Sequence, residues 1–172
     1  DLNELKKYGK IFGCNALYRD FIPDYLISND PIIVNEIIES GYSIDHDVYL
    51  VEQQPSLKIP KDHKFKLVPW GDNLYPINSG WANIRLAFCL YPEEQIYMIG
   101  YDIFGDRNNI YDDTPNYPSS TEEHHMSTEW QGMFYLQVEH FCPGIKLKRV
   151  INSTTKIDNI ENITYDNFWK EI

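Results

Sequence analysis

Short apolar runs separated by turn residues recur along the chain, a pattern that favours strands over long helices. The runs are partly β-branched and are bounded by glycine, proline, asparagine or aspartate, as strands buried on both faces of a sheet should be. They predict strands at residues 11–16, 25–28, 48–51, 65–68, 96–99 and 145–151.

Between these runs, apolar residues recur at the spacing of a helix face. One predicted helix begins at Pro31, a residue suited to a first helical turn, and ends before Gly41, a residue suited to a helix end. Two more are predicted at residues 80–92 and 130–143, each closed by a proline. Helices and strands therefore alternate along most of the chain.

This alternation predicts an α/β fold with parallel strands, right-handed crossovers and a sheet covered on both faces. We expect a Rossmann-like three-layer sandwich with a mostly parallel sheet. The chain has 172 residues, 42% of them hydrophobic, which suits one domain with a real core. A single domain spanning residues 1–172 is therefore predicted.

The segment at about 104–123 breaks the pattern, because it is rich in Asp, Asn, Gly and Pro and has no apolar period. About 20 residues without regular structure inside a compact domain usually form a functional lid or a disordered insert. Tyr111 and Tyr117 favour a lid that orders over a ligand, since a solvated insert has little use for aromatic residues.

Polar residues follow the predicted strands at the edge where ligands of open α/β sheets bind. Asn15 follows the first run, Asp30 the second and Asp102 the fifth, while Ser79 and Gly80 precede the central helix. We predict that these residues face one site.

Composition and charge argue against several classes of function. Fifteen Lys and Arg against 26 Asp and Glu give a net charge of -11, which disfavours binding to nucleic acid. No apolar run is long enough to span a membrane, and the opening residues do not resemble a secretory signal, so a cytoplasmic protein is expected. The three cysteines form neither a disulfide framework nor a metal pair.

Histidine chemistry has one candidate, where the lid meets the third helix. A histidine of the His124-His125 pair could take a proton from a sugar hydroxyl, because the unperturbed pKa of histidine lies near neutrality. The alternative is a solvated His124-His125 pair before a helix that Thr128 caps. Asp45 and Asp47 match an Asp-x-Asp metal pattern, but they precede a strand, and a solvated turn is the better interpretation. No metal site is expected.

Several segments together resemble a known group of proteins. They read IFGCNALYRDF at residues 11–21, PDYLISND at 23–30, NSG at 78–80, IYMIGYD at 96–102 and HHMSTE at 124–129. The chain is similar to proteins encoded by marine bacteriophages and bacteria. More distantly, it resembles the small bacterial sialyltransferases that act on lipooligosaccharide and the glycosyltransferases related to them.

The resemblance implies a Rossmann-like transferase that uses a nucleotide-activated sugar, CMP-linked in the characterised members, without a metal or another cofactor. It places Asn15 against the nucleotide, with a second polar contact from Asp30, where the family has asparagine. Ser79 and Gly80 match the serine-glycine pair that opens the central helix, whose N-terminus suits an anionic donor.

The resemblance also implies the catalytic roles. The family's lid tyrosines stabilise the leaving phosphate, a role that falls to Tyr111, and its histidine base matches His124. Relative to that family, the chain as given lacks the first strand and its glycine-rich loop. Pro76 stands where the sialyltransferases have an arginine.

We therefore expect a metal-independent glycosyltransferase, sialyltransferase-like, that acts in the cytoplasm, of the host if the protein is phage-encoded. Its partners would be a nucleotide-sugar donor and a glycan acceptor, and a homo-oligomer is compatible with the sequence. The alternative is a non-catalytic Rossmann-like module, such as a phage structural or host-interaction protein. A pterin-related pyrophosphokinase is a third alternative, without a visible triphosphate site.

Overall fold

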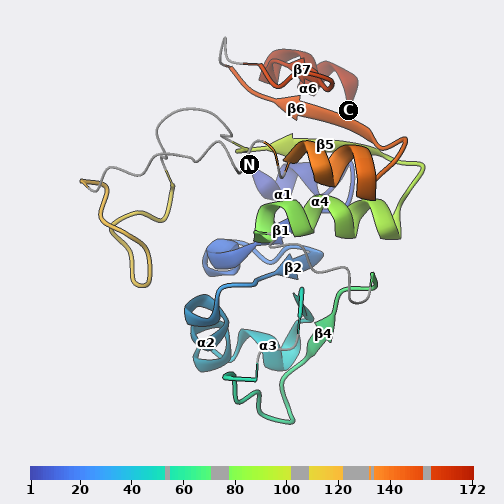
Figure 1. Cartoon of the computed structure of the whole chain (residues 1–172). Coiled ribbons are helices and arrows are strands. Elements are labelled where there is room, and N and C mark those ends of the chain that lie inside the picture. The colour runs from blue at the N-terminus through green and yellow to red at the C-terminus, as the bar shows by residue number, and fades with distance from the viewer. Residues whose placement is uncertain (53–54, 71–77, 102–108, 122–131, 133, 153–155) are drawn as a thin grey trace. The chain divides into compact units, whose positions relative to one another are not determined.

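The computed structural model describes residues 1–52, 55–70, 78–101, 109–121, 132, 134–152 and 156–172 (Figure 1). The chain divides into two compact units, residues 1–86 and 87–172, and the division falls inside one helix, α4 (Ser79–Leu90). Each unit is described by itself. No described helix has the length and apolar character needed to cross a membrane.

Four parallel strands form the sheet of the first unit. They are β1 (Phe12–Cys14), β2 (Tyr25–Ile27), β3 (Val48–Leu50) and β4 (Phe65–Leu67), and they lie side by side in chain order. Each strand falls inside an apolar run that predicts it. The ends of β1 and β2 are level, since Cys14 pairs with Ile27.

Short helices follow β1 and β2. β1 leads into the 3₁₀ helix η1 (Asn15–Arg19), and β2 leads into α2 (Pro31–Glu39), followed by α3 (Tyr42–Asp45). α2 begins where the sequence predicts, because Pro31 occupies its first turn. Gly41, with φ of 76°, takes the left-handed conformation after its end. A short helix α1 (Leu2–Leu5), which the apolar pattern does not predict, precedes β1.

The core of the first unit lies between β2, β3 and α2. Its residues are almost fully inaccessible to solvent and are nearly all aliphatic. They include Leu26, Ile27, Ile33, Val34, Ile37 and Val48. Apolar residues of both the strands and α2 therefore fill the core.

A second parallel sheet belongs to the second unit. β5 (Gln95–Ile99) pairs with β6 (Lys146–Val150), and β6 pairs with β7 (Glu161–Ile163). The sequence predicts β5 and β6 but not β7, because two of the three residues of β7 are polar and form no apolar run. β7 leads into α6 (Tyr165–Glu171), capped by the Thr164 side chain.

The described part of the predicted third helix is helical. It ends in a π-helical turn, η2 (Gln137–Phe141), before β6. The described part of the predicted lid, residues 109–121, contains turns and no helix or strand. With parallel strands in both sheets and helices in the connections, the chain has the predicted Rossmann-like α/β fold.

Gly13 in β1 is required by close packing. A Cβ atom at this position would lie 2.5 Å from Leu17 Cδ2 and 3.1 Å from Pro23 Cγ. Both neighbours belong to the connection between β1 and β2, which returns directly over β1. A side chain at residue 13 would therefore push this connection away from the strand.

We expect Gly13→Ala to lower the free energy of unfolding in urea by about 1–3 kcal/mol, the usual cost of overpacking. Gly9→Ala is the matched control, because a Cβ atom there would meet nothing within 4 Å. Its effect should stay within about 0.5 kcal/mol. Equal effects of the two substitutions would contradict the close approach at Gly13.

Candidate functional site

Asn15 stands at the carboxyl end of β1, where the chain turns into η1. Its backbone is left-handed, with φ of 51°, a conformation that asparagine tolerates better than most residues. The Ser28 hydroxyl, at the end of β2, donates a hydrogen bond to Asn15 Oδ1 over 3.2 Å. Ser28 is fully buried and Asn15 is partly exposed, so this bond is shielded from water on one side.

The Ser28 bond fixes which way the Asn15 amide points. Since Oδ1 accepts from Ser28, the Nδ2 hydrogens are directed elsewhere. Among the described residues, none accepts a hydrogen bond from Asn15 Nδ2. Asn15 therefore presents a pair of donors at the edge of the sheet.

The N-terminus of α4 joins the same edge. The backbone N–H of Asn29, the second residue after β2, donates to Ser79 Oγ over 3.0 Å. Ser79 is the first residue of α4 and is 5% exposed. Asn78 caps the helix, since its Oδ1 accepts from the Trp81 N–H over 2.9 Å.

Two hydrogen bonds thus bring predicted residues together. Asn15 and Ser79 are each bonded to the segment that directly follows β2, and Gly80 follows Ser79 in the first turn of α4. The side chains in these contacts are neutral hydroxyls and amides. They can orient a polar ligand without the cost of burying a charge.

Asp30 lies next to Asn29 and has a structural role. Its carboxylate accepts the Ile32 N–H over 2.9 Å and so caps α2, while the residue as a whole is exposed. One Asp30 oxygen is therefore used by the fold. The other faces no described donor.

Two buried polar residues lie farther along α4, and the sequence pattern does not single them out. Asn83 lies four residues after Ser79 on the same helix face and is 3% exposed. Its Oδ1 accepts no hydrogen bond from the described residues. Arg85, also buried, packs its guanidinium 4.6 Å from the centroid of the Trp70 ring.

The connection after Asn15 is anchored to α2. Arg19 binds the Glu36 carboxylate through two nitrogens, at 2.7 and 2.6 Å, and the Tyr18 hydroxyl donates to the same carboxylate over 2.5 Å. Burial and the hydrogen bond to Glu36 raise the pKa of Tyr18 to about 12. Tyr18 is thus held in a structural ion-pair network, and its hydroxyl is not available to a ligand.

Cys14 precedes Asn15 and is unsuited to nucleophilic chemistry. Burial raises the pKa of its thiol to about 11, so the reactive thiolate is scarce at neutral pH.

Tyr111 belongs to the second unit, in the turns of residues 109–121. The centroids of the Tyr111 and Tyr117 rings lie 5.5 Å apart. The Tyr111 carbonyl accepts a hydrogen bond from the Thr114 hydroxyl over 2.5 Å. The Tyr111 hydroxyl oxygen is buried.

Two predicted site residues, Asp102 and His124, lie outside the described residues. Among the residues that are described, no three His, Cys, Asp or Glu side chains group together as a metal site would require. The expectation that no metal takes part stays a prediction.

Comparisons with known proteins gave no match to a family model, a curated protein or a solved structure.

The hydrogen bond from the Asn29 N–H to Ser79 Oγ can be tested by amide hydrogen exchange. We expect Ser79→Ala to speed hydrogen exchange at the Asn29 N–H about fivefold, because loss of one hydrogen bond removes about 1 kcal/mol of protection. The Ser28 N–H, bonded to the Tyr49 carbonyl within the sheet, should keep its rate. Ser56→Ala at an exposed position is the control variant. Unchanged exchange at Asn29 would show that Ser79 does not hold it.

Proposed function

We propose that the protein is a metal-independent glycosyltransferase, sialyltransferase-like, which transfers a sugar from a nucleotide-sugar donor to a glycan acceptor. One observation carries the proposal: Asn15 and Ser79 are both hydrogen-bonded to the segment that follows β2, at the edge where parallel α/β sheets bind ligands. The segments of the sequence that resemble glycosyltransferases supply the reaction class.

The edge suits the nucleotide part of such a donor. The Asn15 amide offers N–H donors to a base or phosphate oxygen. The first turn of α4, with Ser79 and Gly80, adds the positive end of a helix dipole for the phosphate. Asp30 would add a second polar contact to the nucleotide, and Asp102 is proposed as a further contact to the nucleotide-sugar.

In the reaction that we propose, the acceptor hydroxyl oxygen forms a bond to the anomeric carbon of the donor sugar. The bond from that carbon to the phosphate oxygen breaks, and the nucleotide leaves with the bonding electrons. His124 takes the proton of the acceptor hydroxyl. Tyr111, once its buried hydroxyl is accessible, donates a hydrogen bond to the leaving phosphate.

We expect CMP to bind the full chain in calorimetric titration, more tightly than UDP or GDP. Asn15→Ala should weaken CMP binding about tenfold, because it removes the amide donors. Asn35→Ala is the matched control: Asn35 is an exposed asparagine on α2, away from the β1 and β2 ends. Its CMP affinity should equal that of the unchanged protein.

The same titration separates the two function classes. A protein that binds none of the three nucleotides would contradict the transferase and favour a non-catalytic phage structural or host-interaction module. If CMP binds, His124→Ala should keep that affinity and lower transfer at least 100-fold, the usual contribution of a general base.

A further inference from the structure

The crossover from β3 to β4 differs from the usual parallel connection. Parallel strands are generally joined by a helix that covers one face of the sheet. Here the described residues of the crossover, 55–64, contain turns and no helix. The described part of this crossover is therefore a loop, and it is bonded to α3 through Ser43 and His63.

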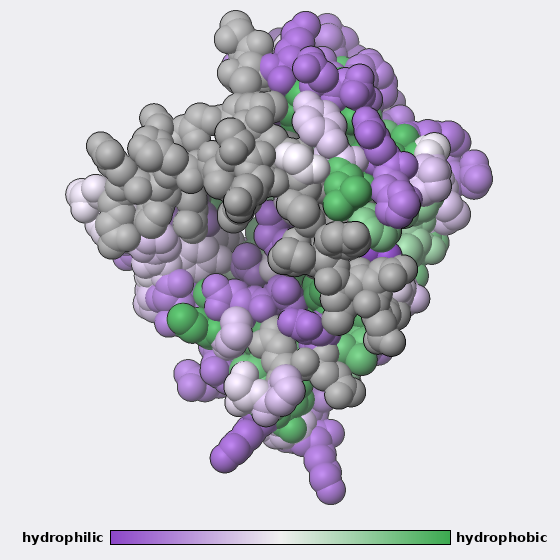
Figure 2. Space-filling model, in the orientation of Figure 1, coloured by the Kyte–Doolittle hydropathy of each residue, from purple (hydrophilic) through white to green (hydrophobic). Residues whose placement is uncertain are grey.

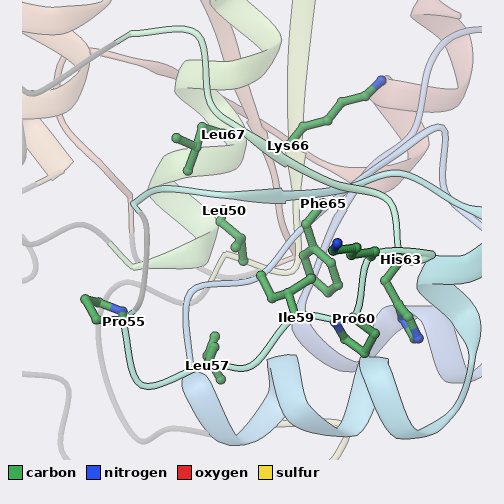
Figure 3. A pocket seen from close by; sticks show the side chains of 10 residues that line it. Leu50, Pro55, Leu57, Ile59, Pro60, His63, Phe65, Lys66 and Leu67 are labelled. Atoms are coloured by element: carbon green, nitrogen blue, oxygen red, sulfur yellow. The ribbon is translucent and has the colours of Figure 1, made fainter.

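A pocket of about 570 Å³ lies beneath this loop (Figure 3). Leu50 from β3 and Phe65 from β4 form its floor, and Leu57 and Ile59 from the loop face them. The volume lies within the range of small-molecule sites, which are mostly apolar with few polar groups. Seven of the ten residues that line the pocket are apolar, so part of it can take an apolar ligand body.

The ionisable residues that line the pocket are all basic, although the whole chain carries a net charge of -11. His63 Nδ1 is bonded to the buried Ser43 hydroxyl at 2.7 Å. Lys66 Nζ forms an ion pair with Asp47 Oδ2 at 2.6 Å. The Lys66 side chain points away from the apolar interior of the pocket (Figure 3). Lys61 remains: it is exposed, and no described residue accepts a hydrogen bond from it.

The surface around the loop has the same mixed character. Ile59 is 37% exposed and Leu67 is 49% exposed, beside lysines at positions 58, 61, 64 and 66. Figure 2 shows hydrophobic and hydrophilic residues next to each other at the lower end of the view, where this loop lies in Figure 1. The loop also contains the exposed Asp62, and Asp47 pairs with Lys66, so Lys61 is the lining cation most open to an anion.

We propose that this pocket binds a small amphipathic monoanion, with its apolar body between the loop and β3–β4 and its carboxylate on Lys61. The pocket uses none of the residues assigned to the glycosyltransferase, so the two proposals are tested independently of each other. A charge-assisted hydrogen bond to a carboxylate is roughly twice as strong as a neutral one. Lys61 should therefore set the preference for an anion.

The test compares decanoate with 1-decanol, which have the same chain length and differ in charge. In titration calorimetry on the full chain we expect saturable binding of decanoate and several-fold weaker binding of decanol. Lys61→Gln should lower decanoate affinity about tenfold and leave decanol affinity unchanged. Lys61→Arg should restore decanoate binding.

Lys58→Gln is the matched control. Lys58 is an exposed lysine in the same loop that does not line the pocket, so the change in net charge is identical while decanoate affinity should be unaffected. Equal losses in the Lys58 and Lys61 variants would overturn the proposal, because they would indicate general charge attraction. Absence of saturable decanoate binding would also overturn it. Binding of the protein to anionic lipid vesicles, without binding of decanoate from solution, would overturn the proposal as well.

Discussion

The short crossover between β1 and β2 is the constraint on which the first unit depends. Two parallel strands that lie side by side usually need a dozen or more residues between them, generally with a helix. Here residues 15–24 make the connection with one 3₁₀ helix. The chain must therefore turn directly after β1, with φ of 51° at Asn15. It must then return close to Gly13.

The same constraint places polar groups at the sheet edge. Because β1 and β2 end level, the residue that makes the sharp turn after β1 lies beside the residues that follow β2. Ser28 then orients the Asn15 amide, and Asn29 reaches the first residue of α4. The Arg19–Glu36 ion pair keeps the crossover on α2, so the turn at Asn15 is held from both sides.

Much of this fold could be predicted from the sequence, because buried parallel strands are apolar throughout. All of the predicted strands are present, whereas β7 was missed because Glu161 and Asn162 interrupt its apolar character. The convergence of Asn15 and Ser79 followed from the rule about strand ends. Ser28 could not be found in this way, since its role depends on a contact between segments far apart in the chain.

The most direct test of this account is amide hydrogen exchange of the full chain with and without CMP. If the crossover presents a nucleotide site, CMP should slow exchange in the segments around Asn15, Asn29 and the first turn of α4, and should leave the loop of residues 55–64 unchanged. Protection confined to other segments, with exchange around Asn15 and Asn29 unaltered at saturating CMP, would contradict the account.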